Sequence, residues 1–286
     1  MPGSKNLVVK GHEPVDVPIW REAFAGADWL RLKASKAYYG FGIPHGDGAP
    51  VVLVPGFLAV DAYLIDLYLW LCRIGYSPYM SRIGHNADCP NILTDHLLKT
   101  VRRARKETGR KVHLVGHSFG GVLARGVATN HPELTESVVT LASPYRGVRV
   151  HPWVLSTSKL VRWSINHRIA RPRHEHIDKD CYTSRCACGF ACTWREDFPT
   201  AVRQLSVYTK SDGIVDWRVC VGDAPEANVE VSGTHVGLVF NPEVYRILAF
   251  HLASVPVDGN NGRAVKAVKA PRRRRKSRGQ VRVSPV

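Results

Sequence analysis

One serine in this 286-residue chain lies in a sequence motif typical of a catalytic nucleophile. Ser118 lies in GHSFG, residues 116–120, which fits the pattern G-x-S-x-G between the apolar run KVHLVG and the small-residue run GGVLARGVATN. At a strand-to-helix corner of this kind the hydroxyl projects from the carboxyl edge of a sheet, and the backbone N–H of Phe119 can face a developing oxyanion. The pattern therefore predicts a nucleophilic serine, and the alternative is a glycine-rich turn without chemistry.

A serine hydroxyl is a weak nucleophile unless a base removes its proton and an acid orients that base. After a nucleophile on such a corner, the acid and then the base follow along the chain. Asp212, in YTKSDGIVDW, comes just past a predicted strand, and Asp216 is its rival. Either aspartate could instead be a turn residue. We prefer Asp212 because it comes first after the strand end, where a rigid element can hold it.

Two histidines follow these aspartates in the chain. His235, in VEVSGTHVGL, comes after a predicted strand in a glycine-flanked loop, where a base could reach Ser118. His251 lies in RILAFHLA beside apolar residues and fits a packed helix position better. The run VPGFLAV places Phe57 after another strand, so its N–H is expected to be a second oxyanion donor. A plain turn before a helix is the alternative for Phe57.

The elements that must position these groups alternate along the chain. Strand-like runs are expected near residues 50–57, 78–84, 111–116, 137–143, 205–210 and 229–233. The runs are continuously apolar, and helical patterns separate most of them, which predicts a mostly parallel sheet covered by helices on both faces. Gly109 is expected to end the helix before the third strand, and Asn241 to cap the last helix.

The chain is expected to comprise an irregular N-terminal segment at 1–17, one α/β domain at 18–256 and a basic, disordered tail at 257–286. A stretch from about 144 to 200 breaks the strand–helix rhythm and is interpreted as an inserted cap with its own helices. The formal net charge is +16, yet ten basic and no acidic residues follow Asn261. The body before them therefore carries only about +6, so the basicity belongs mainly to the tail.

The tail could contact nucleic acid or an anionic membrane surface weakly, but a charge run alone names no partner. The first residues have no apolar core followed by a small-residue cleavage site, and no eighteen-residue stretch lacks a charge. We therefore expect no transmembrane segment and a cytoplasmic protein.

The segments VVLVPGF, VGHSFGGVLAR, VVTLASP, SDGIVD and GTHVGL resemble those of the α/β-hydrolase superfamily, and particularly those of bacterial serine esterases and lipases. The resemblance extends over about residues 50–253 and implies the α/β-hydrolase fold. It also implies that Ser118 is the nucleophile, His235 the base and Asp212 its orienting acid. The amides of Phe57 and Phe119 would form the oxyanion hole.

The same resemblance implies an enzyme without a cofactor that hydrolyses carboxylic esters. The aromatic residues of the predicted cap suggest an apolar acyl group rather than a small charged substrate. An acyltransferase, a thioesterase or an amidase would use the same residues, and a non-catalytic binding scaffold is the alternative from another class. Lipases of this type often have a calcium-site aspartate two residues after the histidine. That position is Gly237 here, so no such calcium site is expected.

Four of the seven cysteines lie within twelve residues: Cys181, Cys186, Cys188 and Cys192. Their spacing, C-x4-C-x-C-x3-C, is not the paired C-x2-C pattern typical of zinc sites. A zinc site, a disulfide that staples the cap, and reduced thiols in a tight loop are the three interpretations left open.

Overall fold

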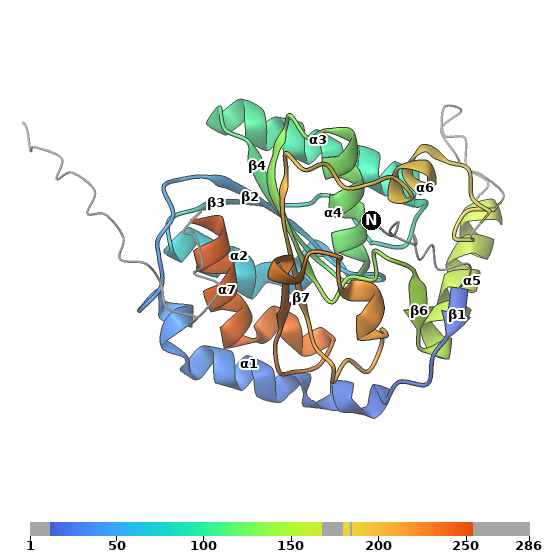
Figure 1. Cartoon of the computed structure of the whole chain (residues 1–286), viewed down its shortest axis with the longest axis horizontal. Helices are drawn as coiled ribbons and strands as arrows, with labels where there is room; N and C mark the ends of the chain where they lie inside the picture. The colour runs from blue at the N-terminus through green and yellow to red at the C-terminus, as the bar shows by residue number, and fades with distance from the viewer. Residues whose placement is uncertain (1–11, 168–179, 184, 254–286) are drawn as a thin grey trace, which may run out of the picture. The chain divides into compact units, whose positions relative to one another are not determined.

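The computed structural model describes residues 12–167, 180–183 and 185–253 (Figure 1). The chain divides into two units, residues 1–254 and 255–286, and every described residue belongs to the first. The predictions for residues 1–11 and for the basic tail at 257–286 therefore lie outside the described residues. Across the three described stretches, no helix is long and apolar enough to cross a membrane.

Six strands of the described residues form one sheet in the order β3-β2-β4-β5-β7-β8. These strands are β2 (Pro50–Val54), β3 (Ser77–Met80), β4 (Val112–His117), β5 (Thr135–Leu141), β7 (Arg203–Tyr208) and β8 (Asn228–Glu230). All neighbouring strands run parallel. The predicted parallel sheet is therefore confirmed, and the carboxyl ends of its strands meet at one edge.

Helices cover both faces of this sheet, which explains why its central strands β2 and β4 are buried on both sides. Successive side chains of a strand point to opposite faces. Val51 and Leu53 of β2 accordingly pack into one core, whereas Val52 and Val54 pack into the other. The first core faces α1 (Ala25–Ala34), α2 (Ile65–Arg73) and α7 (Pro242–Leu252), and the second faces α3 (Pro90–Thr108), α4 (Phe119–Asn130) and α6 (Gly189–Trp194).

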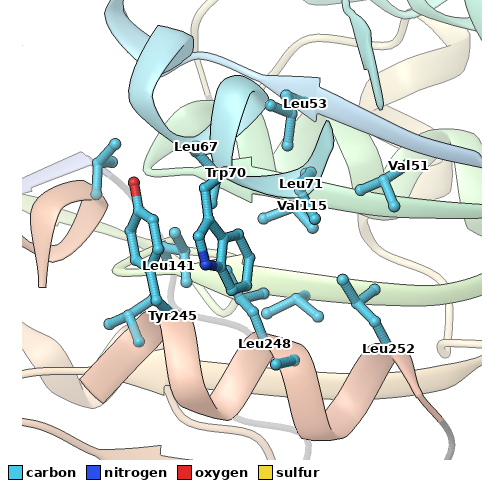
Figure 2. Packing of buried hydrophobic residues seen from close by; sticks show 14 of the residues in the cluster. Val51, Leu53, Leu67, Trp70, Leu71, Val115, Leu141, Tyr245, Leu248 and Leu252 are labelled. Atoms are coloured by element: carbon cyan, nitrogen blue, oxygen red, sulfur yellow. The ribbon is translucent and has the colours of Figure 1, made fainter. Parts of the chain in front are cut away.

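The centre of the first core joins α2 to α7 (Figure 2). The rings of Trp70 and Tyr245 lie with their centroids 4.7 Å apart, and both side chains are fully buried. The Trp70 indole N–H donates to the carbonyl of Ala37 at 2.9 Å, so the polar atom of this large side chain is satisfied. Burial of this kind dominates the free energy of folding.

Two predicted helix ends are confirmed. Gly109 adopts φ 72° directly after α3, a left-handed conformation that glycine reaches without strain. The Asn241 side chain accepts from the backbone N–H of Glu243 at 2.8 Å and caps α7. The described residues also contain short 3₁₀ helices at Ile19–Phe24, Lys36–Tyr39, Asp61–Leu64, Trp217–Cys220, Pro225–Ala227 and Val236–Phe240.

The N-terminal segment, expected to be irregular over 1–17, contains a strand at its end. This strand, β1 (His12–Pro14), pairs in parallel with β6 (Val148–Val150). Three residues are too few to show an alternating pattern, and backbone pairing with a distant segment creates the strand. The stretch predicted as a cap contains β6, α5 (Pro152–His167) and α6, while residues 168–179 and 184 lie outside the described part. Its boundaries at 144–200 stay a prediction.

The two faces of α2 provide a matched test of this packing. Leu71 is completely buried, whereas Leu69 on the same helix is 48% exposed. We expect Leu71→Ala to lower the free energy of unfolding by about 3–5 kcal/mol because it leaves a cavity. Leu69→Ala should change it by no more than about 0.5 kcal/mol. Urea titration followed by circular dichroism measures both, and equal losses would contradict this assignment of the core face.

Candidate active site

The predicted corner serine lies between β4 and α4. The strand ends at His117, the helix begins at Phe119, and Ser118 has φ 51° and ψ −127°. A positive φ is strained for a residue with a side chain, and such strain clusters at functional sites. The Ser118 amide donates to the Leu141 carbonyl of β5 at 2.7 Å, which ties the corner to the neighbouring strand.

Glycines make room for this corner. A Cβ at Gly120 would collide with the backbone carbonyls of Val54 and Pro55 in β2 and the loop after it. A Cβ at Gly116 would collide with the backbone of Gly121, and one at Gly121 would strike the Ser143 hydroxyl. The sequence analysis identified Gly116 and Gly120 through the motif, and the structure adds Gly121.

The residues predicted as acid and base form a direct contact. His235 Nδ1 lies 2.7 Å from Asp212 Oδ2, and the two residues are only 3% and 4% exposed. The other carboxylate oxygen, Oδ1, accepts from the amides of Ile214 at 2.8 Å and Val215 at 2.7 Å. These bonds fix the carboxylate plane, so Oδ2 faces the imidazole.

The charge of Asp212 also changes the proton affinity of the imidazole. Burial by itself lowers the pKa of His235, but the carboxylate charge and hydrogen bond of Asp212, together with the charge of Glu22, outweigh that effect. The net result is a raised pKa of His235, so this site favours the protonated imidazolium more than water does.

The rival candidates lie in other surroundings. Asp216 accepts from the Arg218 amide at 3.1 Å at the start of a 3₁₀ helix and pairs with Arg149 at 3.2 Å, which is a structural role. His251 is packed in α7, where burial lowers its pKa to about 4. The sequence-based preference for Asp212 and His235 thus coincides with the pair that the fold brings together.

Ser118 and His235 line the same cavity, whose volume is about 410 Å³. Its walls are mainly apolar, and α5 contributes Trp153, Val154 and Leu155. The loop after β2 contributes Gly56 and Phe57, so groups that follow β2 and β4 meet with His235 at the carboxyl edge of the sheet.

The two predicted oxyanion donors belong to this cavity as well. Phe57 and Phe119 both line it, and their rings meet edge to face with centroids 6.3 Å apart. Phe119 is the first residue of α4, and the first amides of a helix have no acceptor within that helix. The centroid of the Tyr182 ring lies 6.0 Å from that of Phe57 and 5.9 Å from that of Phe119. The three rings form an aromatic cluster next to Ser118.

Sequence analysis missed the contact that His117, the residue before the serine, makes with the loop of His235. Its Nε2–H donates to the backbone carbonyl of His235 at 2.9 Å, and the two rings lie 4.9 Å apart. Burial, followed by the nearby His235, lowers the pKa of His117 to about 3 although the hydrogen bond to the carbonyl opposes this, so His117 stays neutral near pH 7. The only signal in the sequence is the variable position of G-x-S-x-G, which carries no information about a loop 118 residues away.

The position that holds a calcium aspartate in many lipases is packed differently here. A Cβ at Gly237 would collide with a carboxylate oxygen of Asp28, which comes from α1. Asp28 is buried beneath the loop that contains His235, called the base loop below. It accepts a hydrogen bond from the backbone of Thr234 in that loop. An acid from the N-terminal helix therefore occupies the space that a side chain at position 237 would need.

The cysteine-rich segment approaches the start of α3. Cys186 Sγ lies 3.3 Å from Cys188 Sγ, and Cys89 before α3 contacts both Cys181 and Cys188. Chiefly through the hydrogen bond with Cys181, the pKa of the Cys89 thiol rises to about 12. Within the described stretches, no three His, Cys, Asp or Glu residues are placed to hold a metal ion. The zinc, disulfide and reduced-thiol interpretations of Cys181, Cys186, Cys188 and Cys192 stay open.

A profile of the palmitoyl protein thioesterase family matches residues 50–197, just over half of the chain. The chain belongs to this family. The part that matches the palmitoyl protein thioesterases contains Phe57, Ser118 and Phe119, whereas Asp212 and His235 follow it.

Curated relatives of this palmitoyl protein thioesterase family member include lipases. It is 33% identical over 132 residues to a triacylglycerol lipase of Burkholderia plantarii, which covers 43% of this chain and 37% of the relative. It is 43% identical over 104 residues to a triacylglycerol lipase of Pseudomonas fragi, covering 34% and 35%. The matched segments thus span little more than a third of the length of these relatives.

The fold has a counterpart among solved structures. The mature form of a Bacillus licheniformis lipase superposes with a TM-score of 0.50 at 16% identity, covering 74% of this chain and 94% of the lipase. At this identity the likeness concerns the fold alone, and it confirms the predicted α/β-hydrolase architecture.

Gly120 offers a test of the corner. We expect Gly120→Ala to lower the free energy of unfolding by about 2 kcal/mol or more, because the new methyl group meets backbone atoms that cannot rotate away. The control is Gly26→Ala in α1, where nothing lies within 4 Å of the added Cβ. That change should stabilise the protein by about 0.5–1 kcal/mol. Thermal and urea unfolding measure both, and a neutral Gly120→Ala would disprove close packing at the corner.

Proposed function

We propose that the protein is a serine hydrolase that cleaves carboxylic esters through an acyl-enzyme. Ser118 is its nucleophile, His235 its general base and then acid, and Asp212 its orienting carboxylate. One observation carries the proposal: a buried Asp212–His235 pair lines the same cavity as a serine with a strained backbone. The triacylglycerol lipase relatives support ester cleavage.

The reaction follows from the proposed roles. The Ser118 hydroxyl attacks the ester carbonyl while His235 accepts its proton, and the Asp212 carboxylate stabilises the resulting imidazolium. The amides of Phe57 and Phe119 donate to the tetrahedral oxyanion. The imidazolium then protonates the departing alcohol, and a water activated by the same imidazole releases the acid from Ser118.

The cavity favours an apolar acyl group. Its volume of about 410 Å³ and its valine, leucine and aromatic walls suit a hydrocarbon chain. Each methylene that the walls bury is worth about 0.8 kcal/mol, which corresponds to about a fourfold gain in kcat/KM while space remains. A small charged substrate would find little compensation for its lost hydration here.

A second candidate is thioester hydrolysis, which the description of the matching family favours. The triad would attack a thioester carbonyl in the same way and release a thiol instead of an alcohol. Acyltransfer and amide hydrolysis also use this chemistry, so the leaving group must be identified by assay. The cytoplasmic location and the weak contact of the tail with anionic surfaces stay predictions.

Ser118→Ala tests whether the protein is an enzyme or a non-catalytic scaffold. We expect the wild type to react with a fluorophosphonate probe and to hydrolyse p-nitrophenyl esters, with kcat/KM rising with acyl length until the cavity is filled. The variant should not react with the probe and should lose about 10⁶-fold in kcat, because the nucleophile is gone. Ser164→Ala, at an exposed position of α5, is the matched control. Matched S-acyl substrates measure thioester preference, and a wild type that ignores the probe and every substrate would favour the scaffold.

Asp212 and Asp216 can be separated by the same substitution. Asp212→Asn should lower kcat by about 10⁴-fold with the protein still folded, because the amide no longer orients the imidazole or stabilises its charge. Asp216→Asn should lower stability instead, since it weakens the pair with Arg149, while kcat stays near that of the wild type. Initial rates and unfolding curves of both variants decide between them, and the reverse pattern would make Asp216 the acid.

A further inference from the structure

One carboxylate from the N-terminal part of the chain reaches both loops of the proposed acid–base pair. Glu22 lies in the 3₁₀ helix Ile19–Phe24, ahead of the segment that the family profile matches. Its Oε1 accepts from the amide of Gly213 at 2.9 Å and from the amide of His235 at 3.0 Å. Its Oε2 accepts from the amide of Val236 at 2.8 Å.

These three amides belong to the two loops that matter for the proposed reaction. Gly213 follows Asp212 directly, in what we call the acid loop. His235 and Val236 lie in the base loop. A single side chain therefore joins the backbone of the acid loop to that of the base loop. Three charge-assisted hydrogen bonds to one carboxylate are stronger than neutral ones and fix its orientation.

The packing around Gly213 shows that the site is built for this carboxylate. A Cβ at Gly213 would lie 2.8 Å from Glu22 Oε1 and 2.8 Å from the Pro18 carbonyl. Any side chain at position 213 would thus push the Glu22 carboxylate away from the three backbone amides that donate to it. The conformation of the acid loop and the contact with Glu22 depend on each other.

We infer that Glu22 is a positioning residue of the proposed triad, which holds the acid and base loops together and places a second negative charge beside the imidazole. The inference rests on the proposed function and deepens it. Glu22 touches no substrate in this scheme and acts only through His235 and the residue next to Asp212.

Several elements bring titratable groups toward His235. They are Asp212 after β7, Glu22, His117 of β4, Tyr63 of the 3₁₀ helix Asp61–Leu64, and Asp28 of α1. His117 and Tyr63 are neutral near pH 7, because burial lowers the pKa of the first and raises that of the second. Asp28 contacts the loop at Thr234 and Gly237, and burial raises the pKa of its carboxyl.

Asp212 and Glu22 are the charges that raise the pKa of His235 against the opposing effect of burial. Loss of the Glu22 charge therefore lowers the pKa of the imidazole. Since the base must be neutral to accept a proton, the acid limb of the pH–rate profile should then move to lower pH. A residue with a purely structural role would leave that limb in place.

Glu22→Gln tests the inference in the full-length protein. The glutamine is nearly the same size but has no charge and only one acceptor oxygen for three amides. We expect kcat/KM for a p-nitrophenyl ester to fall by about 10- to 100-fold at its plateau, as small displacements of catalytic groups do. The acid limb should move to lower pH, and Glu22→Asp, which keeps the charge, should restore the limb toward its wild-type position. Glu226→Gln, an exposed site with the same charge change, should alter neither.

An NMR titration of the His235 imidazole in wild type and Glu22→Gln gives a readout that needs no turnover. A lower imidazole pKa in the variant supports the inference even if the wild type cleaves no ester, in which case the proposed function alone fails. A folded Glu22→Gln protein with an unmoved imidazole pKa overturns it, whatever happens to the rate.

Discussion

Backbone-to-backbone contact between β2, β4 and the start of α4 determines where the Ser118 hydroxyl lies. The positive φ of this serine is possible because Gly116, Gly120 and Gly121 have no side chains that would hold the helix away from the sheet. Everything else in the proposed site is arranged around this corner. The acid and base loops follow β7 and β8, two strands on the same side of β4 in the sheet, so they reach the cavity from one side.

The fold and the central groups could be predicted because their signals are local. Continuous apolar runs indicated buried parallel strands. The five-residue motif around Ser118 contains glycines because the tight backbone corner leaves no room for side chains there. Asp212 and His235 followed from chain order and from their places after strands. His117 and Glu22 could not be predicted in this way, because each acts on a loop far along the chain. Glu22 lies in a short 3₁₀ helix without a periodic pattern, and only the tertiary structure shows which amides it accepts from.

The proposed site draws on three separate parts of the sequence. The proposed nucleophile and both proposed oxyanion amides lie in the region that matches the palmitoyl protein thioesterase family. Glu22 precedes that region, and the acid–base pair follows it. Within the matched region, α5 adds apolar side chains to the cavity that Ser118 also lines, and these suit a hydrocarbon chain better than a polar substrate. The proposed chemistry and the proposed substrate selection therefore reside on different elements, which meet only in the folded protein.

The contact between Asp28 and Gly237 limits how this architecture can diverge. The carboxylate of α1 fills the space beneath the base loop that any side chain at position 237 would enter. A bulkier residue at 237 is therefore compatible only with a shorter residue at 28 or with a differently placed N-terminal helix. The side chains that positions 28 and 237 can hold are thus sterically coupled. A descendant of this protein could gain a metal-binding aspartate after its base only by first giving up the acid that now buttresses the loop from within.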